Sequence, residues 1–282
     1  MKINELSTKI KPTWCPGCGN YGILAALKGA LIELNLSPSE ILVTYGIGCH
    51  GHMANYLATN GFESLHGRPL PVAIGAKIAN QRLAVLVSSG DGDAYGEGLS
   101  HLINAARGNH DVTLLVHNNG VYGLTTGQAL PVSPKGFQSK STPLGVIETP
   151  INPLALALVS GATFVARGFA HDINHLKNLL IKAISHSGFA LVDVLQPCIT
   201  FNRSRPLAWY KKRIYKLEEK KHNQQDFEQA LERALENEKM PLGVFYQIKK
   251  PTYEELLPQL RKKPLVPQPI KKVEIKQLLE KL

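Results

Sequence analysis

The sequence predicts an α/β protein built on a doubly wound, mostly parallel sheet. Residues 83–87 form an apolar run short enough to be a buried parallel strand, and residues 112–116 form a second run of the same kind. Between the two runs, apolar residues over 99–106 recur at helical spacing. This order of strand, turn, helix and strand is typical of open α/β sheets with a parallel core.

The same patterns predict the other main elements. Helices are expected over 23–34 and 173–184, and strands over 41–43, 163–166 and 190–195. Residues 133–150 are rich in Pro, Gly and Ser without periodicity, so we expect a surface loop near the site there.

Length and charge bound the domain organisation. With 282 residues the chain has room for one such sheet and some appendages, and we expect a sheet domain over 1–202, a basic helical extension over 203–260 and a linker with a short helical tail over 261–282. Most of the net charge of +10 lies beyond about residue 203, in the extension and the tail together, where lysines are interspersed with glutamates. No nucleic-acid motif accompanies this charge, so no nucleic-acid partner is expected.

The apolar runs are too short to span a membrane, and a cytoplasmic protein is expected.

Two polar turns follow neighbouring predicted strands. Gly90-Asp91-Gly92 comes directly after the first strand, and Asn118-Asn119 follows the second. Parallel strands deliver such turns to the same edge of the sheet, where Asp91 and Asn119 would supply oxygen ligands of the kind that Mg²⁺ prefers. Gly90 and Gly92 would let the backbone approach a diphosphate. The spacing fits a magnesium diphosphate site of the thiamine diphosphate type, although ordinary turns use the same residues.

The four cysteines all lie beside Gly or Pro in predicted loops: Cys15, Cys18, Cys49 and Cys198. Inert structural cysteines are usually core residues within elements, so this placement favours metal ligands. A structural zinc site usually has a second closely spaced pair, which Cys49 and Cys198 do not form. A four-iron four-sulfur cluster takes four thiolates and accepts distant ones. The cysteines alone favour the cluster and leave open zinc, a redox pair or unrelated thiols.

Together these segments resemble the beta subunit of the 2-oxoacid:ferredoxin oxidoreductases, closest to the 2-oxoglutarate branch. The resemblance runs in the family's order from about residue 12 to about residue 202 and weakens beyond. It is carried by Trp14-Cys15-Pro16-Gly17-Cys18-Gly19, Gly46-Ile47-Gly48-Cys49, Leu65-His66-Gly67-Arg68, Gly90-Asp91-Gly92-Asp93, Asn119-Gly120-Val121-Tyr122-Gly123-Leu124-Thr125, Gly127-Gln128, Lys140-Ser141-Thr142-Pro143 and Pro197-Cys198.

The resemblance implies a thiamine diphosphate-binding fold and a role for each motif residue. Cys15, Cys18, Cys49 and Cys198 would hold a four-iron four-sulfur cluster, and Asp91, Asn119 and the carbonyl of Val121 would hold magnesium. The residues implied to line thiamine diphosphate are Ile47, Gly48, Cys49, His50, His66, Gly90, Gly92, Asp93, Gly123 and Leu124.

The implied activity is the oxidative decarboxylation of a 2-oxoacid, with the acyl group passed to coenzyme A and electrons passed through the cluster to ferredoxin. Thiamine enzymes use a second domain whose glutamate activates the cofactor, and the chain contains no such second half. We therefore expect an alpha subunit to supply this glutamate, in a heterodimer or a dimer of heterodimers, with Glu33 or Glu97 as internal alternatives. No catalytic residue is assigned to this chain.

The expected substrate is 2-oxoglutarate, with pyruvate or several 2-oxoacids as the alternative. A distal carboxylate needs a cation, for which His50, His52, Arg68 and Lys135 are candidates. Relatives often carry Lys where this chain has Thr126, which weakens any assignment based on a lysine there. Two other classes remain open: a thiamine decarboxylase or synthase without a cluster, and a non-catalytic zinc-binding module.

Overall fold

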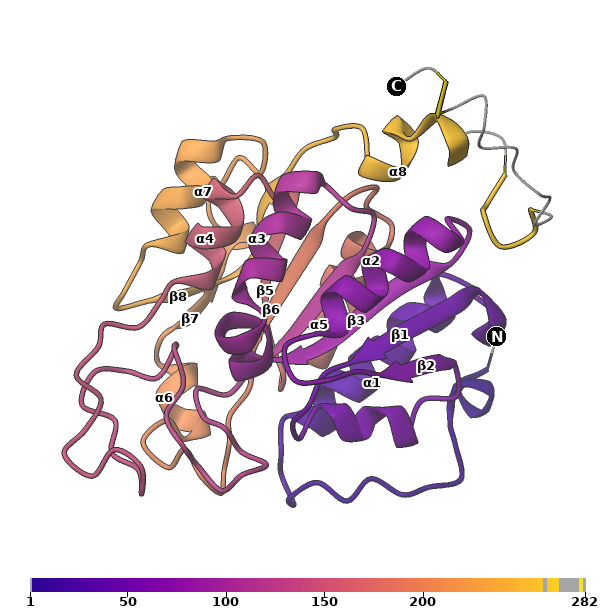
Figure 1. The fold of residues 1–282 in the computed structure, drawn as a ribbon. Helices are drawn as coiled ribbons and strands as arrows, with labels where there is room; N and C mark the ends of the chain where they lie inside the picture. Colours follow the sequence, from indigo (N-terminus) through magenta and orange to yellow (C-terminus); the bar gives the residue numbers. More distant parts are fainter. Residues whose placement is uncertain (1, 261–262, 269–278, 281–282) are drawn as a thin grey trace.

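A computed structural model describes residues 2–260, 263–268 and 279–280. Within these residues, eight strands form one sheet in the order β2-β1-β3-β4-β6-β5-β8-β7 (Figure 1). The strands are β1 (Ile41–Tyr45), β2 (Asn60–Glu63), β3 (Ala84–Gly90), β4 (Thr113–Asn118), β5 (Phe164–Phe169), β6 (Ala190–Leu195), β7 (Ile214–Lys216) and β8 (Met240–Gln247). Neighbours among β1 to β6 are parallel, and β8 is antiparallel to β5. The predicted mostly parallel sheet is confirmed.

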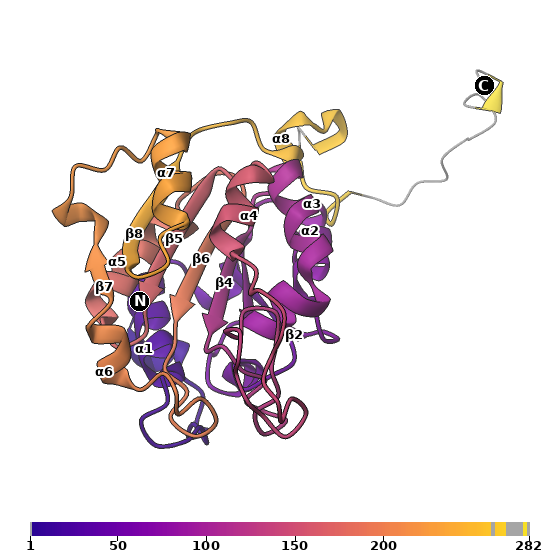
Figure 2. The same ribbon diagram turned by 90° about the vertical axis from the view of Figure 1, so that its left-hand side faces the viewer.

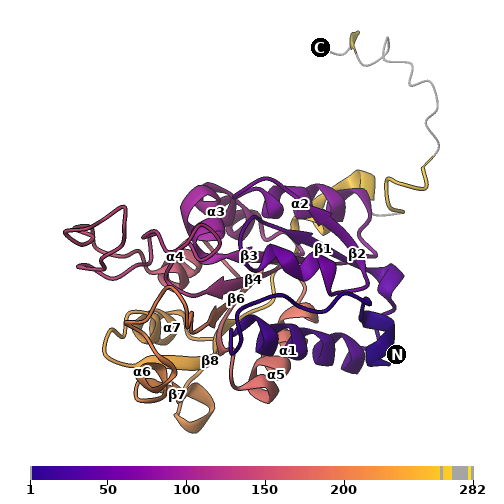
Figure 3. The same cartoon turned by 90° about the horizontal axis from the view of Figure 1, so that it is seen from below.

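Helices cover both faces of the sheet, as Figure 3 shows from below. The helices are α1 (Asn20–Glu33), α2 (Pro69–Ala79), α3 (Leu99–Gly108), α4 (Pro153–Val159), α5 (Ile173–Ile184), α6 (Leu207–Lys211), α7 (Phe227–Ala234) and α8 (Tyr253–Leu256). One hydrophobic core lies under α1 and α5, and a second lies under α2, α3, α4 and α7. The doubly wound arrangement is therefore confirmed.

Strand β3 illustrates why the central strands are mostly apolar. Leu86 packs into the core under α1 and α5, whereas Val85 and Val87 pack into the core on the other face. Because both faces are covered, such a strand is a continuous apolar run rather than an alternating one. The same reasoning applies to β4 and β6, which are buried along almost their whole length.

The order of the strands places a switch point between β1 and β3. The chain leaves β1 for β2 on one side and then returns to β3 on the other, so the loops after β1 and β3 run in opposite directions. Open α/β sheets bind ligands in the crevice at such a point. Figure 2 shows the loop that follows β4 extending beyond the carboxyl ends of β4 and β6. Residues 133–150 of this loop contain no helix or strand, as expected.

The extension over 203–260 contains strands as well as helices, so its description as helical is wrong. Strand β8 joins the main sheet beside β5, and β7 pairs with β8. Val244 and Phe245 of β8 enter different cores, which makes the strand apolar on both faces. This local pattern does not separate a strand from a buried helix.

The remaining predictions on domain organisation concern boundaries. The division at residue 202 stays a prediction. The predicted linker and helical tail over 261–282 lie mostly outside the described residues. Among the helices of the part of the chain that the structure describes, none has the length and apolar character needed to cross a membrane.

Candidate functional site

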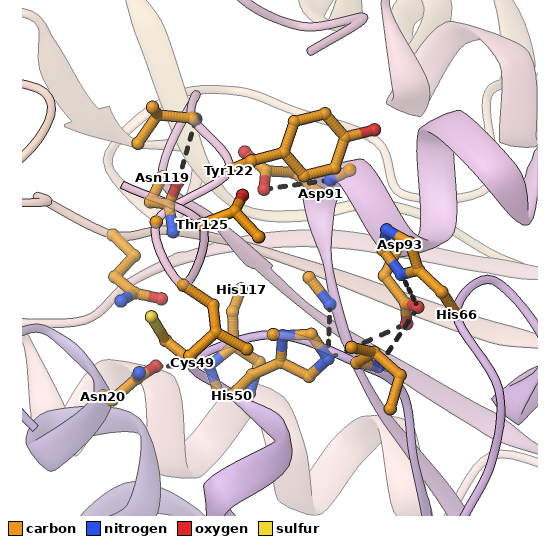
Figure 4. Close-up of a pocket in the computed structure, with 18 residues that line it drawn as sticks. Asn20, Cys49, His50, His66, Asp91, Asp93, His117, Asn119, Tyr122 and Thr125 are labelled. Atoms are coloured by element: carbon orange, nitrogen blue, oxygen red, sulfur yellow. Dashed lines mark hydrogen bonds and ion pairs between the residues drawn. The ribbon is translucent and has the colours of Figure 1, made fainter. Parts of the chain in front are cut away.

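A pocket lies at the carboxyl ends of β1, β3 and β4, at the switch point of the sheet (Figure 4). All residues that the resemblance assigned to thiamine diphosphate or to magnesium line it: Ile47, Gly48, Cys49, His50, His66, Gly90, Asp91, Gly92, Asp93, Asn119, Val121, Gly123 and Leu124. The sequence segments thus converge on one site, while the role of each residue stays a prediction.

Asp91 joins the turns after β3 and β4. Its carboxylate is almost fully buried and accepts the amide of Gly92 at 3.0 Å and the amide of Gly120 at 2.5 Å. Burial raises the pKa of Asp91 to about 7, although these two amides oppose the shift. A cation beside the carboxylate would favour its ionised form, so this environment suits a metal ligand.

Asn119 supplies a second oxygen on the same wall. Its Oδ1 accepts the amide of Val121 at 2.9 Å, and its backbone carbonyl accepts the side-chain amide of Asn202 at 2.8 Å. Each oxygen of Asp91 and Asn119 keeps lone-pair capacity beyond these bonds. A carboxylate and an amide oxygen from two adjacent turns are the hard donors that magnesium takes when a substrate phosphate completes its shell. The residues therefore fit a magnesium diphosphate.

Asp93 holds three segments of the pocket wall together. Its buried Oδ1 accepts the amide of Gly67 at 2.6 Å, the amide of Ile47 at 3.3 Å and a hydrogen bond with His66 Nδ1 at 2.7 Å. Its Oδ2 accepts the Ser89 hydroxyl at 2.5 Å. With its oxygens occupied in this way, the carboxylate positions the loops after β1, β2 and β3 relative to one another.

His50 is buried and uncharged. Its Nε2 accepts the Gly90 amide at 3.1 Å, and the ring also interacts with the backbone of Gly46. Burial lowers the pKa of His50 to about 3, despite the opposing effect of Asp93. This environment does not favour His50 as the cation considered for a distal carboxylate. His52, Arg68 and Lys135, the other candidates for that cation, do not line the pocket.

The four cysteines approach one another beside the pocket. Cys49 lines it, and its thiol is close enough to those of Cys15, Cys18 and Cys198 for electrostatic interaction. Burial raises the pKa of Cys49 to about 11, with the other three thiols adding to the shift, whereas bound iron would favour the thiolates. Among the described residues, no group of three or more His, Cys, Asp or Glu side chains is arranged to hold a metal ion. A cluster differs from a single ion in that each thiolate binds a different iron, so its ligands need not meet at one point.

Five polar or aromatic residues line the pocket although no sequence motif assigned them a role: Asn20, His117, Tyr122, Thr125 and Gln196. His117 is buried at the end of β4, where its Nδ1 is 2.8 Å from Asn20 Oδ1 and its Nε2 is 3.2 Å from Ser88 Oγ. Burial lowers the pKa of His117 to about 3, so it too is neutral. A histidine in an otherwise apolar strand was the signal available for it.

Tyr122 lies directly over Gly92. A Cβ atom at Gly92 would lie 2.1 Å from Tyr122 Cε1, so only glycine allows this approach. The Tyr122 hydroxyl donates to Glu97 at 3.0 Å, and Glu97 also contacts His66 Nε2 at 3.2 Å. The ring thereby closes one side of the pocket.

A buried ion pair between Arg167 and Asp193 supports the turn after β4. Asp193 in β6 accepts from Arg167 Nε at 3.1 Å, from the Tyr95 hydroxyl at 2.8 Å and from Asn118 Nδ2 at 2.9 Å. Asp193 is fully buried, and its partners come from three other segments. Through Asn118 the pair fixes the start of the turn that carries Asn119.

Two protein-family models match the chain. The model described as "Thiamine pyrophosphate enzyme, C-terminal TPP binding domain" matches residues 46–194, which begin directly after β1 and include β2 to β5, nearly all of β6 and most of the pocket. The model for the C-terminal part of the pyruvate ferredoxin oxidoreductase beta subunit matches residues 198–262.

Curated relatives and a solved structure agree with these matches. The 2-oxoacid:ferredoxin oxidoreductase subunit beta of Saccharolobus solfataricus is 48% identical over 247 residues, which cover 83% of this chain and 81% of the relative. The 2-oxoglutarate oxidoreductase subunit KorB of Mycobacterium tuberculosis is 48% identical over 201 residues, 71% of this chain and 54% of that protein.

The structure of the 2-oxoglutarate:ferredoxin oxidoreductase from Magnetococcus marinus, with 2-oxoglutarate, coenzyme A and succinyl-CoA bound, matches with a TM-score of 0.92 at 33% identity. The match covers 99% of this chain and 95% of that one. With a thiamine-binding domain over its central sheet and relatives that share nearly half its sequence, the chain belongs to the beta subunits of the 2-oxoacid:ferredoxin oxidoreductases.

Proposed function

We propose that this chain binds magnesium and thiamine diphosphate in the pocket, carries a four-iron four-sulfur cluster beside it, and acts with an alpha subunit in the coenzyme A-linked oxidative decarboxylation of 2-oxoglutarate. The observation that carries the proposal is the convergence of Asp91 and Asn119 with Cys49 on the wall of one pocket. The wall of the pocket thus combines the chemistry of a diphosphate site with a thiol.

Each part of the pocket has a distinct task in this proposal. Asp91 and Asn119, with the carbonyl of Val121, would hold the metal, while the Gly90 to Gly92 turn faces the diphosphate. When bound, thiamine diphosphate supplies a nucleophilic carbon and an electron sink for the decarboxylation. Asp93 keeps the surrounding loops in place, and Tyr122 limits access of water from one side.

Electron transfer is assigned to the cysteines. Cys15, Cys18, Cys49 and Cys198 would hold the cluster, and Cys49 is also part of the pocket wall, which would give electrons a short path out of the site. Zinc in the same place could not accept electrons because it has no redox chemistry. Ferredoxin is the proposed acceptor, in keeping with the names of the relatives.

The alpha subunit would supply the glutamate that activates the cofactor. Of the internal alternatives, Glu33 lies at the end of α1 in an ion pair with Lys177 at 2.5 Å, and Glu97 is bonded to Tyr122 and His66. Neither glutamate lines the pocket. This supports a glutamate contributed from another chain.

The choice of 2-oxoglutarate as substrate has its support in the solved structure with that ligand bound and in the relatives named for it. Since His50 is neutral and the other candidate cations lie outside the pocket, the cation for the distal carboxylate is assigned to the alpha subunit. Pyruvate, or several 2-oxoacids, is the second candidate, favoured by the match of residues 198–262 to a pyruvate ferredoxin oxidoreductase model.

The test is anaerobic purification of the chain together with its alpha subunit, followed by assays of iron, sulfide and zinc and by reduction of ferredoxin with a panel of 2-oxoacids. We expect about four irons per chain and coenzyme A-dependent reduction that is fastest with 2-oxoglutarate. Asp91→Asn should remove activity with the iron retained, and Asp111→Asn, outside the pocket, should not. Zinc in place of iron, or no reduction with any 2-oxoacid, would overturn the proposal.

A further inference from the structure

Gln196 occupies a buried position between the pocket and the cysteines. It follows the last residue of β6 and precedes Pro197-Cys198. Its side chain is 2% exposed and lines the pocket, and its Nε2 lies 3.5 Å from Cys18 Sγ, a hydrogen bond to sulfur. The Gln196 amide is therefore in contact with a thiol proposed as a cluster ligand.

Packing holds the Gln196 side chain in this place. A Cβ atom at Gly19 would lie 2.6 Å from Gln196 Cγ, so the glycine beside Cys18 leaves the space that the glutamine fills. The backbone amide of Gln196 donates to the carbonyl of Asn118 at 2.8 Å, which fixes the main chain as well. The donor thus reaches the sulfur from a rigid support.

Cys18 Sγ is thus placed as the acceptor of the Gln196 side-chain N–H. Hydrogen bonds to the sulfurs are one of the means by which a protein sets the reduction potential of an iron-sulfur cluster.

The carbonyl oxygen of the Gln196 amide is buried as well. Gln196 Oε1 has no partner of ordinary hydrogen-bond geometry among the described residues, although the Gln196 side chain also interacts with His117. The bond from Nε2 to Cys18 is therefore the one contact of ordinary geometry recorded for this amide among the described residues.

We propose that Gln196 is a positioning residue that acts through Cys18 and raises the reduction potential of the cluster. The inference rests on the proposed function, since it needs the cluster to be present. The N–H group withdraws electron density from the thiolate and so stabilises the reduced cluster, which carries the more negative charge. Loss of the donor should therefore shift the midpoint potential to a more negative value.

The test uses the alpha–beta complex with Gln196→Met, which keeps the length of the side chain without its donor, and Gln196→Glu, which keeps the shape and adds a negative charge. The control is Gln229→Met, the same change at a partly buried glutamine bonded to Asp226 in α7. Midpoint potentials would be measured by anaerobic redox titration followed by electron paramagnetic resonance, after the iron content of each variant has been determined.

We expect a more negative midpoint potential in Gln196→Met, a larger shift in Gln196→Glu, and the wild-type potential in Gln229→Met. An unchanged potential in a fully loaded Gln196→Met would overturn the inference. Loss of the cluster from both variants at position 196 would also overturn it, because Gln196 would then serve assembly. If the wild-type complex itself contains no iron, the proposed function fails, and that outcome is separate from any variant.

Discussion

Gly92 is the residue at which the pocket tolerates an added atom least. Its backbone has ordinary helical torsion angles, with φ at −65°, so a side chain there meets no conformational penalty. The obstacle is the Tyr122 ring, which a Cβ atom would approach to 2.1 Å. We predict that Gly92→Ala displaces Tyr122 and weakens thiamine diphosphate binding at least tenfold, as measured by calorimetric titration in the presence of magnesium.

Gly75 provides the matched control for this change. It lies within α2, and a Cβ atom there would have no heavy atom within 4 Å. Gly75→Ala should leave cofactor binding unchanged and stabilise the fold by about 0.5–1 kcal/mol, because alanine loses less backbone entropy in a helix. Equal cofactor affinity in Gly92→Ala and in wild type would contradict the prediction.

Thr126 has a strained backbone. Its φ is +76°, in the left-handed region that β-branched residues rarely adopt, and its side chain is exposed. Thr126→Asn should stabilise the protein by about 1 kcal/mol, because asparagine accepts this conformation more readily. Chemical denaturation would measure the change. Thr126→Val keeps the branched Cβ, and a gain of the same size in this variant would refute the strain argument.

Site residues could be predicted from the sequence where they lie in turns with a recognisable composition. Asp91 and Asn119 follow apolar strands and are flanked by glycine, so their meeting could be predicted from parallel pairing. Asn20 and Gln196 could not be found in this way, because their place in the pocket depends on how α1 packs against the end of β6. Residues 176 positions apart carry no local signal of contact.

At the scale of elements, the buried pair of Arg167 and Asp193 joins β5 to β6. Asp193→Asn would leave the Arg167 guanidinium buried without a counter-charge, and we expect a loss of about 3–5 kcal/mol in the free energy of unfolding. The exposed pair of Glu33 and Lys177 is the control: Glu33→Gln should cost less than about 1 kcal/mol. Urea titrations of both variants would compare them, and similar losses would count against the buried pair.

Helix α8 is attached to the sheet through Glu254. This carboxylate is almost fully buried, 2.9 Å from His110 Nδ1, and it accepts the Asp111 amide at 3.1 Å. Burial raises the pKa of Glu254, but the bonds to His110 and Asp111 outweigh it, so the pKa lies below its usual value of 4.5. The resulting stability is present above pH 4.5 and is lost as the pH falls through the folded-state pKa.

We therefore predict that Glu254→Gln lowers the free energy of unfolding at pH 7 by about 2 kcal/mol and removes part of the acid sensitivity below pH 4.5. Thermal unfolding at several pH values would measure both effects. The exposed Glu238 is the control, since Glu238→Gln should change neither. Identical pH profiles for Glu254→Gln and wild type would show that α8 is held by other contacts.

Helices and strands could be predicted from the sequence where one apolar periodicity dominated the segment. The helix expected over 173–184 is α5 (Ile173–Ile184), because its apolar residues recur on a single face. Strand β2 (Asn60–Glu63) was missed, since all four of its residues are exposed and no alternation marks it. Helix α2 (Pro69–Ala79) was missed for the opposite reason: most of its residues are apolar, so it has no clear polar face.

At the scale of the whole molecule, the net charge of +10 should influence encounters with an acidic protein acceptor. Ferredoxin reduction at subsaturating ferredoxin should therefore slow as ionic strength rises, because salt screens the attraction. A small cationic viologen as acceptor is the control and should show no such loss. Equal salt dependence with both acceptors would show that salt slows the reaction itself rather than the association with ferredoxin.

The pocket draws on residues from Asn20 to Gln196, which includes every strand of the parallel part of the sheet. No chain that stops before the end of β6 can complete it. During synthesis, cofactor capture must therefore wait until about two thirds of the protein has emerged from the ribosome and β6 has inserted between β4 and β5. Retention of thiamine diphosphate would then serve as a reporter of finished folding, and partly folded chains would be marked by their failure to keep it.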